Sequence, residues 1–235
     1  MKLSVIISIY NSHGALERQT KHFKGLDLDI EYIFVDDGSD PPLTGELGTF
    51  YQTNNKLAWT QGLGRNLGAS KATGEYLLMT DIDHILTKEA LEDVLNFDGD
   101  FMRFPRFFGI LDENGELKTD KEYLKSYGIK PAYLNMEEMR TNVHRNTFAI
   151  RKEIFDILGG YDDAWCTYGF HPKTRRGDDC YFDGVWRRFA KKKGMVQVMG
   201  SKIYVFPNGR FHKDGDKNPF GLFHDLHHKE ERFYK

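Results

Sequence analysis

Short, almost continuous apolar runs constrain the fold of this chain more than any other feature of its sequence. The runs occupy residues 3–10, 30–35 and 75–80, with a further candidate near 56–59. They lack the alternation of a half-exposed strand, so they are typical of strands buried on both faces of a parallel sheet. Such a sheet needs helices on both faces. The first half of the chain, to residue 97, therefore predicts an α/β fold with a doubly wound, mostly parallel central sheet.

Helices are expected between and after these strands. The predicted helical segments are residues 15–23, 62–72, a segment that begins after Thr87, one that ends at Gly159-Gly160, and 178–193, which stops at Gly194. The second half is expected to add strands at residues 102–108, 147–150, 195–199 and 202–206, with a turn at 111–116. These signals are less regular than those of the first half, so the topology of the second half is left open.

The composition fits one soluble domain and excludes several classes of protein. The chain has 235 residues, a formal net charge of -2 and two cysteines, Cys166 and Cys180. Two cysteines outside a Cys-x-x-Cys pair predict neither a disulfide framework nor a zinc site. The near-neutral charge gives no global sign of nucleic-acid binding. The first apolar run is too short for a signal peptide, and no run reaches the roughly 18 residues of a membrane span, so we expect a cytoplasmic location.

Two aspartates, Asp81 and Asp83, directly follow the strand predicted at 75–80. Side chains alternate along extended backbone, so the two carboxylates point the same way and repel each other. A hard divalent cation, Mn2+ or Mg2+, relieves this repulsion and is usually shared with substrate phosphates. This Asp-x-Asp pair therefore indicates a metal–diphosphate site and a nucleotide-linked substrate, whereas the plain alternative is a polar turn at a strand end.

Polar residues also follow the other two predicted strands. Asn11 comes after the first run, and Asp36 and Asp37 come after the second. Ligands of open α/β sheets bind at the carboxyl ends of the strands. We therefore expect Asn11, Asp36, Asp37, Asp81 and Asp83 to form one shared site.

Four segments, in order, resemble the successive signatures of family 2-like glycosyltransferases, which have the GT-A fold. They are residues 5–11, 33–39, 64–68 and 74–83, and a weaker likeness continues at 146–151, 159–162 and 177–179. The resemblance implies a metal-dependent glycosyltransferase that moves a sugar from a nucleoside-diphosphate sugar, with UDP favoured, to an acceptor hydroxyl. It also implies a single GT-A domain with a nucleotide-sugar half at residues 1–97, an acceptor-side half at 98–206 and a tail over the site at 207–235.

On the donor side, the resemblance assigns roles to five residues. It implies that Asp36 or Asp37 contacts the nucleoside base and that Tyr10 and Asn11 line the base pocket. It implies that Arg65 lies near the nucleotide and helps to hold the stretch beside the diphosphate. These roles are expectations for the nucleotide half of the site.

Five further residues receive metal-binding or catalytic roles from the same resemblance. Asp83 is expected to bind the metal directly, and Asp81 to contact the ribose or to reach the metal through water. His212 is the candidate that completes the metal shell from the end of the chain. The acidic pair Asp178-Asp179 is expected to supply the catalytic base, with Asp179 favoured over Asp178.

The simplest chemistry for this arrangement is direct displacement with inversion at the sugar carbon. Glycosyl transfer passes through an oxocarbenium-like state, as glycoside hydrolysis does. A metal neutralises the charge on the departing diphosphate, and a carboxylate accepts the proton of the acceptor hydroxyl.

One departure from the family's spacing affects the assignment of the base. Residues 170–176 separate Tyr168-Gly169 from Gly177 and the acidic pair.

Two other function classes stay open at this point. A nucleotidyltransferase also joins an α/β sheet to a metal–phosphate site, but it usually has a basic glycine-rich loop after the first strand, and residues 11–14 are Asn-Ser-His-Gly. A non-catalytic binder of sugar nucleotides or nucleic acid would bind its ligand and need no base. The acceptor is equally open among a glycan, a lipid-linked saccharide, a protein and a modified nucleic-acid base.

Five cations gather near the end of the helix predicted at 178–193. They are Arg187, Arg188, Lys191, Lys192 and Lys193. Such a cluster complements the negative end of the helix dipole. It also suits the phosphates of a nucleic acid or of lipid head groups, so peripheral contact with a membrane is an open alternative although no transmembrane segment is expected.

Overall fold

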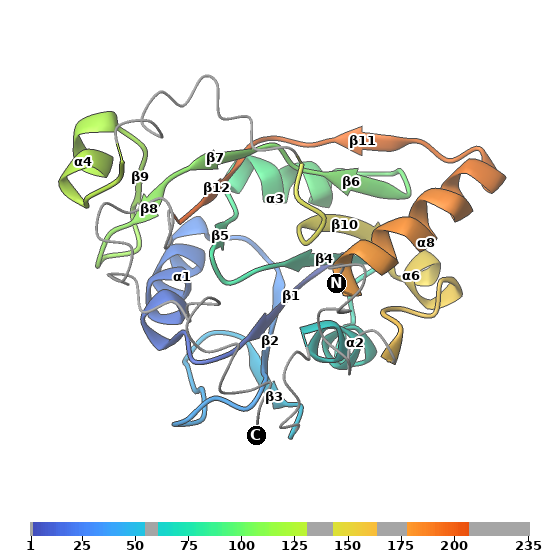
Figure 1. Ribbon diagram of the computed structural model, residues 1–235, viewed down its shortest axis with the longest axis horizontal. Helices are drawn as coiled ribbons and strands as arrows, with labels where there is room; N and C mark the ends of the chain where they lie inside the picture. Colours follow the sequence, from blue (N-terminus) through green and yellow to red (C-terminus); the bar gives the residue numbers. More distant parts are fainter. Residues whose placement is uncertain (1, 55–60, 131–142, 164–177, 207–235) are drawn as a thin grey trace.

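A seven-stranded sheet forms the centre of the computed structural model, which describes residues 2–54, 61–130, 143–163 and 178–206 (Figure 1). Four parallel strands from the first half of the chain lie side by side, in the order β3 (Thr49–Gln52), β2 (Glu31–Asp36), β1 (Leu3–Ile9) and β4 (Tyr76–Thr80). The strand order reverses between β1 and β4, which is where open α/β sheets bind ligands. The predicted doubly wound, mostly parallel sheet is confirmed.

The other side of the sheet comes from the second half of the chain. β10 (Phe148–Arg151) runs antiparallel between β4 and β6 (Phe101–Arg103), and β11 (Gln197–Met199) pairs in parallel with β6 at the edge. Because β10 is antiparallel to β4, the residues just before β10 lie at the same end of the sheet as the residues just after β4. This arrangement brings residues 143–147 to the candidate site.

Helices cover both faces of the sheet and explain the apolar runs. On one face lie α1 (His13–Leu26) and α3 (Lys88–Leu95); on the other lie α2 (Gln61–Lys71), α6 (Lys152–Ile157) and α8 (Asp178–Lys193). Along β1, Val5 and Ile7 pack into the first layer and Ile6 into the second. Both faces of the strand are therefore buried, and neither presents polar side chains to solvent.

A second, three-stranded sheet and a hairpin complete the described fold. The sheet contains β5 (His84–Ile85), β12 (Ile203–Val205) and β7 (Arg106–Phe108); the hairpin joins β8 (Ile110–Leu111) to β9 (Leu117–Lys118), and α4 (Lys121–Ser126) follows. The hairpin confirms the turn predicted at 111–116. No helix among the described residues is both long enough and apolar enough to cross a bilayer.

The single strand predicted at 102–108 is wrong. Phe104-Pro105 divides it into β6 and β7, which belong to different sheets. Proline has no N–H with which to continue a strand ladder, so the chain leaves the first sheet there. The Pro105 carbonyl instead accepts a 2.9 Å hydrogen bond from the N–H of Ile203, which starts the second sheet.

Most predicted helix boundaries are confirmed. Thr87 caps α3, because its hydroxyl accepts a 3.1 Å hydrogen bond from the N–H of Ala90. α8 covers the predicted residues 178–193, and Gly194 follows it with a φ of +69°, where glycine is favoured. The third described strand is β3, and the candidate near 56–59 lies outside the described residues.

Two glycines of α2 let this helix lie unusually close to β1. A Cβ on Gly64 would lie 2.3 Å from Oγ of Ser8, and one on Gly68 would lie 2.5 Å from Cγ2 of Ile6. The glycine-rich stretch therefore serves helix–sheet packing. The close approach fixes the position of Arg65, which lies between the two glycines.

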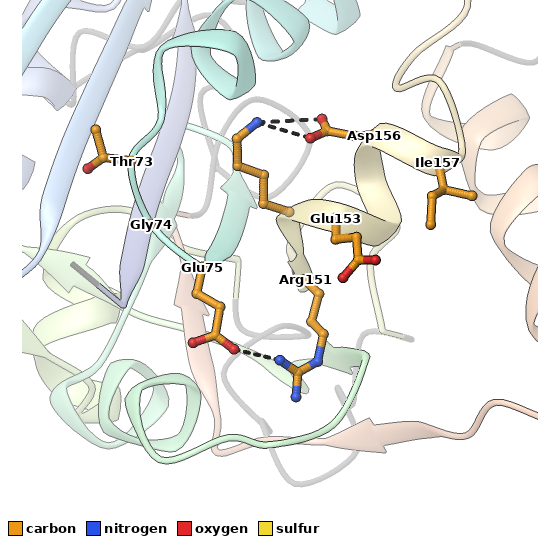
Figure 2. Close-up of a pocket in the computed structure, with 8 residues that line it drawn as sticks. Thr73, Gly74, Glu75, Arg151, Glu153, Asp156 and Ile157 are labelled. Atoms are coloured by element: carbon orange, nitrogen blue, oxygen red, sulfur yellow. Dashed lines mark hydrogen bonds and ion pairs between the residues drawn. The ribbon is translucent and has the colours of Figure 1, made fainter.

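The opposite, amino-terminal end of β4 borders an open pocket of about 780 Å3 (Figure 2). Its lining comes from the segment before β4 and from the start of α6, and includes Glu75, Arg151 and Lys152. Arg151 pairs with Glu75 at 2.5 Å, and Lys152 pairs with Asp156 at 3.3 Å. This pocket lies at the end of the sheet opposite the strand-end aspartates.

Candidate active site

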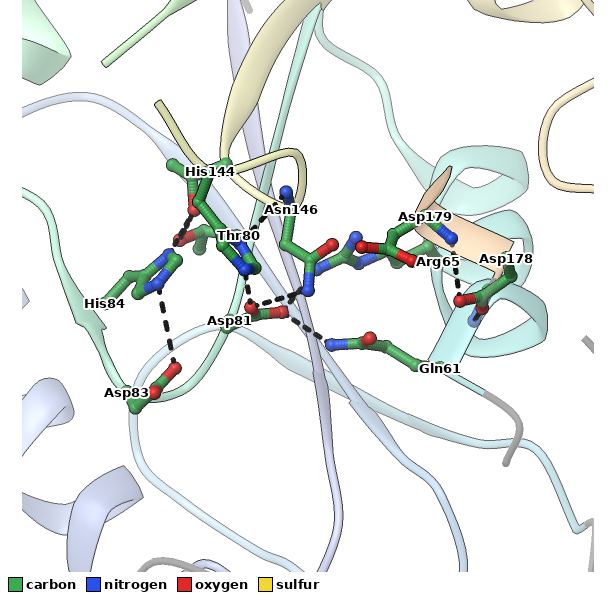
Figure 3. A network of polar contacts seen from close by, with 12 residues as sticks. Gln61, Arg65, Thr80, Asp81, Asp83, His84, His144, Asn146, Asp178 and Asp179 are labelled. Atoms are coloured by element: carbon green, nitrogen blue, oxygen red, sulfur yellow. Dashed lines mark hydrogen bonds and ion pairs between the residues drawn. The ribbon is translucent and has the colours of Figure 1, made fainter. Parts of the chain in front are cut away.

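Asp81 is the centre of a polar network at the carboxyl end of β4 (Figure 3). Its Oδ1 accepts hydrogen bonds from Nε2 of Gln61 and Nη2 of Arg65, each at 2.5 Å, and its Oδ2 accepts one from Nδ2 of Asn146 at 2.8 Å. Burial by itself raises the pKa of Asp81, but the charge of Arg65 and the other polar neighbours, the Asn146 amide among them, together outweigh burial, and the pKa falls to about 2. Asp81 is therefore a carboxylate that joins β4, α2 and the segment before β10.

Arg65 carries this network across to the loop after α6. Its side chain is 1% exposed, and its Nη1 donates to the Tyr161 hydroxyl at 2.9 Å. The neighbouring Asn66 accepts from the N–H of Tyr161 at 2.8 Å and donates to its carbonyl at 2.7 Å. Both residues come from the predicted 64–68 motif, and together they fix α2 against the second half of the chain.

The acidic pair at the start of α8 lies on the opposite side of Arg65 from Asp81. Asp178 is buried, and its two oxygens accept from the N–H groups of Gly62 and Asp179 at 2.7 and 2.8 Å. Burial raises the pKa of Asp178. Asp179 is only partly buried, and its carboxylate points toward the Asp81 network (Figure 3). The two adjacent acids therefore have different surroundings.

A buried ion pair between Arg103 and Asp183 fixes α8 to the sheet. Nη2 of Arg103, on β6, donates to Oδ1 of Asp183, one turn after Asp179, and both side chains are almost fully buried. Arg187 donates to the other oxygen of Asp183 at 2.8 Å. The pair holds the first turns of α8, and with them Asp179, in a fixed place.

Two histidines that the sequence analysis missed lie beside Asp81. His84 is buried: its Nδ1 bonds to the Thr147 hydroxyl, and its Nε2 is 3.0 Å from Nη1 of Arg106. A guanidinium can only donate, so Nε2 of His84 is an acceptor and the ring is neutral. Burial also lowers the pKa of His84 well below its usual value. Nδ1 of His144, which is more exposed, lies 3.9 Å from Oδ2 of Asp81.

These groups make a cluster that can hold a metal ion. Asp81, His84 and His144 each offer one ligand atom within 4.8 Å of the others, and Oδ1 of Asp83 lies 3.9 Å from Nε2 of His84. Carboxylate oxygens suit Mn2+ and Mg2+, and imidazole nitrogen favours a transition metal. Asp81 and His84 already accept from protein donors, whereas the side chains of Asp83 and His144 are 24% and 36% exposed. The donor set therefore fits a divalent cation, and Asp83 and His144 are its accessible members.

The donor-side residues of β1 and β2 meet at the same end of the sheet. Both oxygens of Asp36 accept from backbone N–H groups, those of Ser39 and Leu43, at 2.8 and 2.9 Å. Oδ1 of Asp37 accepts from the Thr53 hydroxyl at 2.9 Å. Of the two alternatives for base contact, Asp36 thus uses both carboxylate oxygens within its own loop, whereas Asp37 bonds to a hydroxyl beyond β3.

Asn11 joins the loop after β1 to the loop after β2. Its N–H donates to Oγ of Ser39 at 2.9 Å, and its Oδ1 accepts from the N–H of Asp40 at 2.8 Å. The half-buried Tyr10 precedes it. The structure thus brings Asn11, Asp36, Asp37, Asp81 and Asp83 to one end of the sheet, while His212 lies outside the described residues.

A weak sequence signal for the missed residues exists. His84 directly follows Asp83, and His144 and Asn146 directly precede the strand predicted at 147–150. Residues before a strand lie at the wrong end of a parallel sheet, so their place in the site depends on the antiparallel direction of β10. The sequence pattern gives no direction for that strand.

Comparisons with known proteins identify the family and the fold of the chain. The sequence profile of the family described as Glycosyl transferase family 2 matches residues 4–159. Among solved structures, S. aureus TarS is similar with a TM-score of 0.52 and 16% identity, over 88% of this chain and 37% of that one. The chain thus spans little more than a third of TarS, and at this identity the likeness concerns the fold.

A second solved structure aligns along almost the whole chain. The galactosyltransferase LgtC, in complex with donor and acceptor sugar analogues, gives a TM-score of 0.49 and 12% identity, over 97% of this chain and 99% of that one. Comparison with curated protein sequences gives no match.

Proposed function

The chain belongs to glycosyltransferase family 2 and has the GT-A fold, and from this premise we propose a metal-dependent, inverting transfer of a sugar from a nucleoside-diphosphate sugar to an acceptor hydroxyl. UDP is the favoured nucleotide, as the family resemblance implies. The observation that carries the proposal is a difference in hydrogen bonding and exposure among the aspartates at one end of the sheet. Both oxygens of Asp81 and both oxygens of Asp178 already accept hydrogen bonds from protein donors, whereas Asp83 and Asp179 are partly exposed to solvent.

Asp83 is the proposed direct ligand of the divalent ion, Mn2+ or Mg2+, with His144 beside it. Asp81 holds the cluster together and contacts the ion through water, because its oxygens are already bonded to Gln61, Arg65 and Asn146. When bound, the ion supplies Lewis-acid neutralisation of the charge that gathers on the departing diphosphate. His212 stays a proposed further ligand from the end of the chain.

Asp179 is the proposed general base. Its carboxylate accepts the proton of the acceptor hydroxyl while the hydroxyl oxygen bonds to the anomeric carbon and the bond from that carbon to the diphosphate breaks. Asp178 suits this role less, because one of its oxygens accepts from the N–H of Gly62 in α2 and the other from the N–H of Asp179. Its part is to position Asp179, together with the buried pair of Arg103 and Asp183.

Asp37, Asn11 and Tyr10 are the proposed lining of the nucleoside pocket, with Asp37 preferred to Asp36 for contact with the base. Arg65 contributes by fixing α2 beside the site, since its guanidinium is occupied by Asp81 and Tyr161. We assign residues 1–97 to the donor half and residues 98–206 to the acceptor half. The proposed acceptor is a hydroxyl of a glycan, a lipid-linked saccharide, a protein or a modified nucleic-acid base.

A thermal-melting screen with UDP, GDP, CDP, TDP and NAD, each with and without Mn2+, tests the donor assignment. A ligand that binds only the folded state stabilises it by about 2.7 kcal/mol at a hundredfold excess over Kd. We expect one nucleoside diphosphate to raise the melting temperature only with Mn2+, and Asp83→Asn to abolish the effect. Asp98→Asn is the control, because this carboxylate is fully exposed and lies beside Arg151 at the other end of the sheet.

Turnover assays distinguish a glycosyltransferase from a nucleotidyltransferase and from a non-catalytic binding protein. Asp179→Asn should keep the Mn2+-dependent stabilisation but lower release of the nucleoside diphosphate from its sugar by about 10²–10⁴-fold, as for loss of a general base. Pyrophosphate release from a nucleoside triphosphate would instead identify a nucleotidyltransferase. Full activity in Asp179→Asn would refute the assigned base, and stabilisation by NAD without metal would refute the donor site.

A further inference from the structure

A strongly basic stretch without any acid follows the active-site end of α8. Residues 184–202 contain six lysines and arginines and no aspartate or glutamate, although the whole chain has a net charge of -2. The stretch covers the second half of α8, the turn at Gly194 and β11, the edge strand of the large sheet. Positive charge is thus concentrated in one segment of a chain whose other residues carry a net negative charge.

The cations of this stretch are exposed and mostly unpaired. Arg187, Arg188 and Lys191–Lys193 all lie at the surface. Arg187 donates to Asp183, but Arg188 and the three lysines form no ion pair with any residue in the described part of the chain. Their charge is therefore available to an external anion.

Two exposed apolar side chains follow the cations in the chain. Val196 is 72% exposed and Met199 is 51% exposed, and of the described large hydrophobic residues only Ile157 is comparably open. A 2.9 Å hydrogen bond from the N–H of Met195 to the Ala190 carbonyl holds the start of this segment against the end of α8. Figure 1 shows α8 running outward from the site and β11 returning along the edge of the molecule.

We propose that this surface, the α8–β11 strip (Arg187, Arg188, Lys191–Lys193, Val196 and Met199), docks on an anionic lipid bilayer. Clusters of four to eight cations bind anionic lipid surfaces, and each cation strengthens binding roughly fivefold. The two exposed apolar side chains enter the boundary between head groups and acyl chains, as in interfacial elements with a basic and an apolar part. Complementarity to the helix dipole accounts for lysines in the last turn, but it explains neither the arginines one turn earlier nor the exposed Val196 and Met199.

The side chains of the strip favour a bilayer over a nucleic acid. Surfaces that bind single-stranded nucleic acid combine cations with exposed aromatic rings on which bases stack. Here the aromatic residues of α8 are packed inward: Trp186 is 1% exposed and stacks on Phe101 at 4.1 Å between ring centroids, and Phe189 packs against the same core. The strip instead offers lysines and aliphatic side chains.

Docking through the strip would also set the orientation of the enzyme. α8 has 16 residues, so its axis is about 24 Å long, with the acidic pair at one end and the lysines at the other. Docking through the lysine end would then hold Asp179, the proposed base, at most about 24 Å from the bilayer surface. This consequence rests on the proposed function, whereas the docking itself does not.

Vesicle co-sedimentation of the full chain tests the docking without any enzymatic readout. We expect binding to vesicles of phosphatidylcholine with 30% phosphatidylglycerol at about 0.1 M salt, and much weaker binding to pure phosphatidylcholine. Lys191→Glu with Lys192→Glu should weaken binding by at least roughly 25-fold, two cations at fivefold each. The matched control is Lys88→Glu with Lys121→Glu, two exposed lysines elsewhere, which should change binding less than twofold.

The apolar part of the strip needs a separate variant. Val196→Ser with Met199→Ser keeps every charge and should weaken vesicle binding several-fold; binding of a single-stranded oligonucleotide at the same salt serves as the comparison. Melting curves confirm that each variant is folded. No binding to the anionic vesicles, equal loss in both lysine pairs, or oligonucleotide binding that is tighter than vesicle binding and indifferent to Val196 and Met199 would each overturn the proposal.

Discussion

The two ends of β4 carry the same kind of ionic group in opposite surroundings. At the carboxyl end, Asp81 pairs with Arg65, whose side chain is 1% exposed. At the amino end, Glu75 pairs with Arg151, which also reaches Asp98 and Asp100, and these partners are largely open to solvent. One end forms the candidate active site, and the other borders the open pocket of Figure 2.

The difference shows that burial, rather than the number of ion pairs, decides what such a cluster does. Exposed pairs gain little, because water screens the charges and the side chains lose freedom. A buried pair is costly to form and more costly to break, because a lone charge is then left without solvent. The site end therefore holds its groups rigidly, whereas the pocket end is a solvated surface. Four predictions test this contrast.

Arg65→Met should have the largest effect. The substitution leaves the partly buried Asp81 with only neutral donors and removes a bond to Tyr161, so we expect a loss of about 3–5 kcal/mol in the free energy of unfolding. Urea denaturation measures the loss. A change below about 1 kcal/mol would show that the network is open to water and would remove the contrast between the two ends.

Thr147→Val should cost about 1–3 kcal/mol, because it leaves the buried Nδ1 of His84 and the Thr80 hydroxyl without their shared partner. The matched substitution at the other end is Thr73→Val, where the side chain is exposed and a change within about 0.5 kcal/mol is expected. Thermal melting of the two variants measures both losses in stability. Equal losses would mean that the position along β4 is irrelevant.

Gly64→Ala should destabilise by about 1–3 kcal/mol, because the new methyl group would overlap Ser8 and push α2 away from β1. The control is Gly25→Ala in α1, where nothing lies within 4 Å of the added Cβ. There alanine should stabilise by about 0.5–1 kcal/mol through helix propensity. Opposite signs in urea denaturation are the expected result, and a stabilising Gly64→Ala would refute the close packing that positions Arg65.

Arg151→Met should have the smallest effect, at most about 1 kcal/mol, and this should shrink further in 1 M salt. A double-mutant cycle with Glu75→Gln measures the pair directly, with an expected coupling of about 0.2–1 kcal/mol. A coupling of several kcal/mol would show that the ion pair at this end of β4 is as strongly coupled as a buried pair, and would contradict the contrast.

Much of the first half of the fold was accessible from the sequence. The continuous apolar run at 3–10 predicts a strand buried on both faces, and Val5 and Ile6 do pack into opposite layers. The Asp-x-Asp pair was placed correctly at the end of β4. The hydrophobic stripe and the glycine stop of α8 fixed its bounds. In each of these cases the signal is local, because period and chain-breaking residues act within one element.

Other features depended on contacts between distant segments. The direction of β10 is not encoded in its own four residues, yet it decides that His144 and Asn146 lie beside Asp81. The division of the strand at 102–108 required partners in two sheets as well as Pro105. The neighbouring acids Asp178 and Asp179 look equivalent in sequence. In the structure Asp178 is buried and accepts from two backbone N–H groups, whereas Asp179 is partly exposed.

The sequence by itself determined the α/β class, the order of the main elements and the identity of the strand-end aspartates, because periodicity, caps and parallel-strand logic depend on near neighbours along the chain. Only the tertiary structure decided which carboxylates are already occupied. The oxygens of Asp81 accept hydrogen bonds from α2 and from the segment before β10. Those of Asp36 accept from its own loop, and those of Asp178 accept from α2 and from its own helix. The state of a carboxylate depends on the donors and the solvent that surround it, and those come from residues far away in the chain.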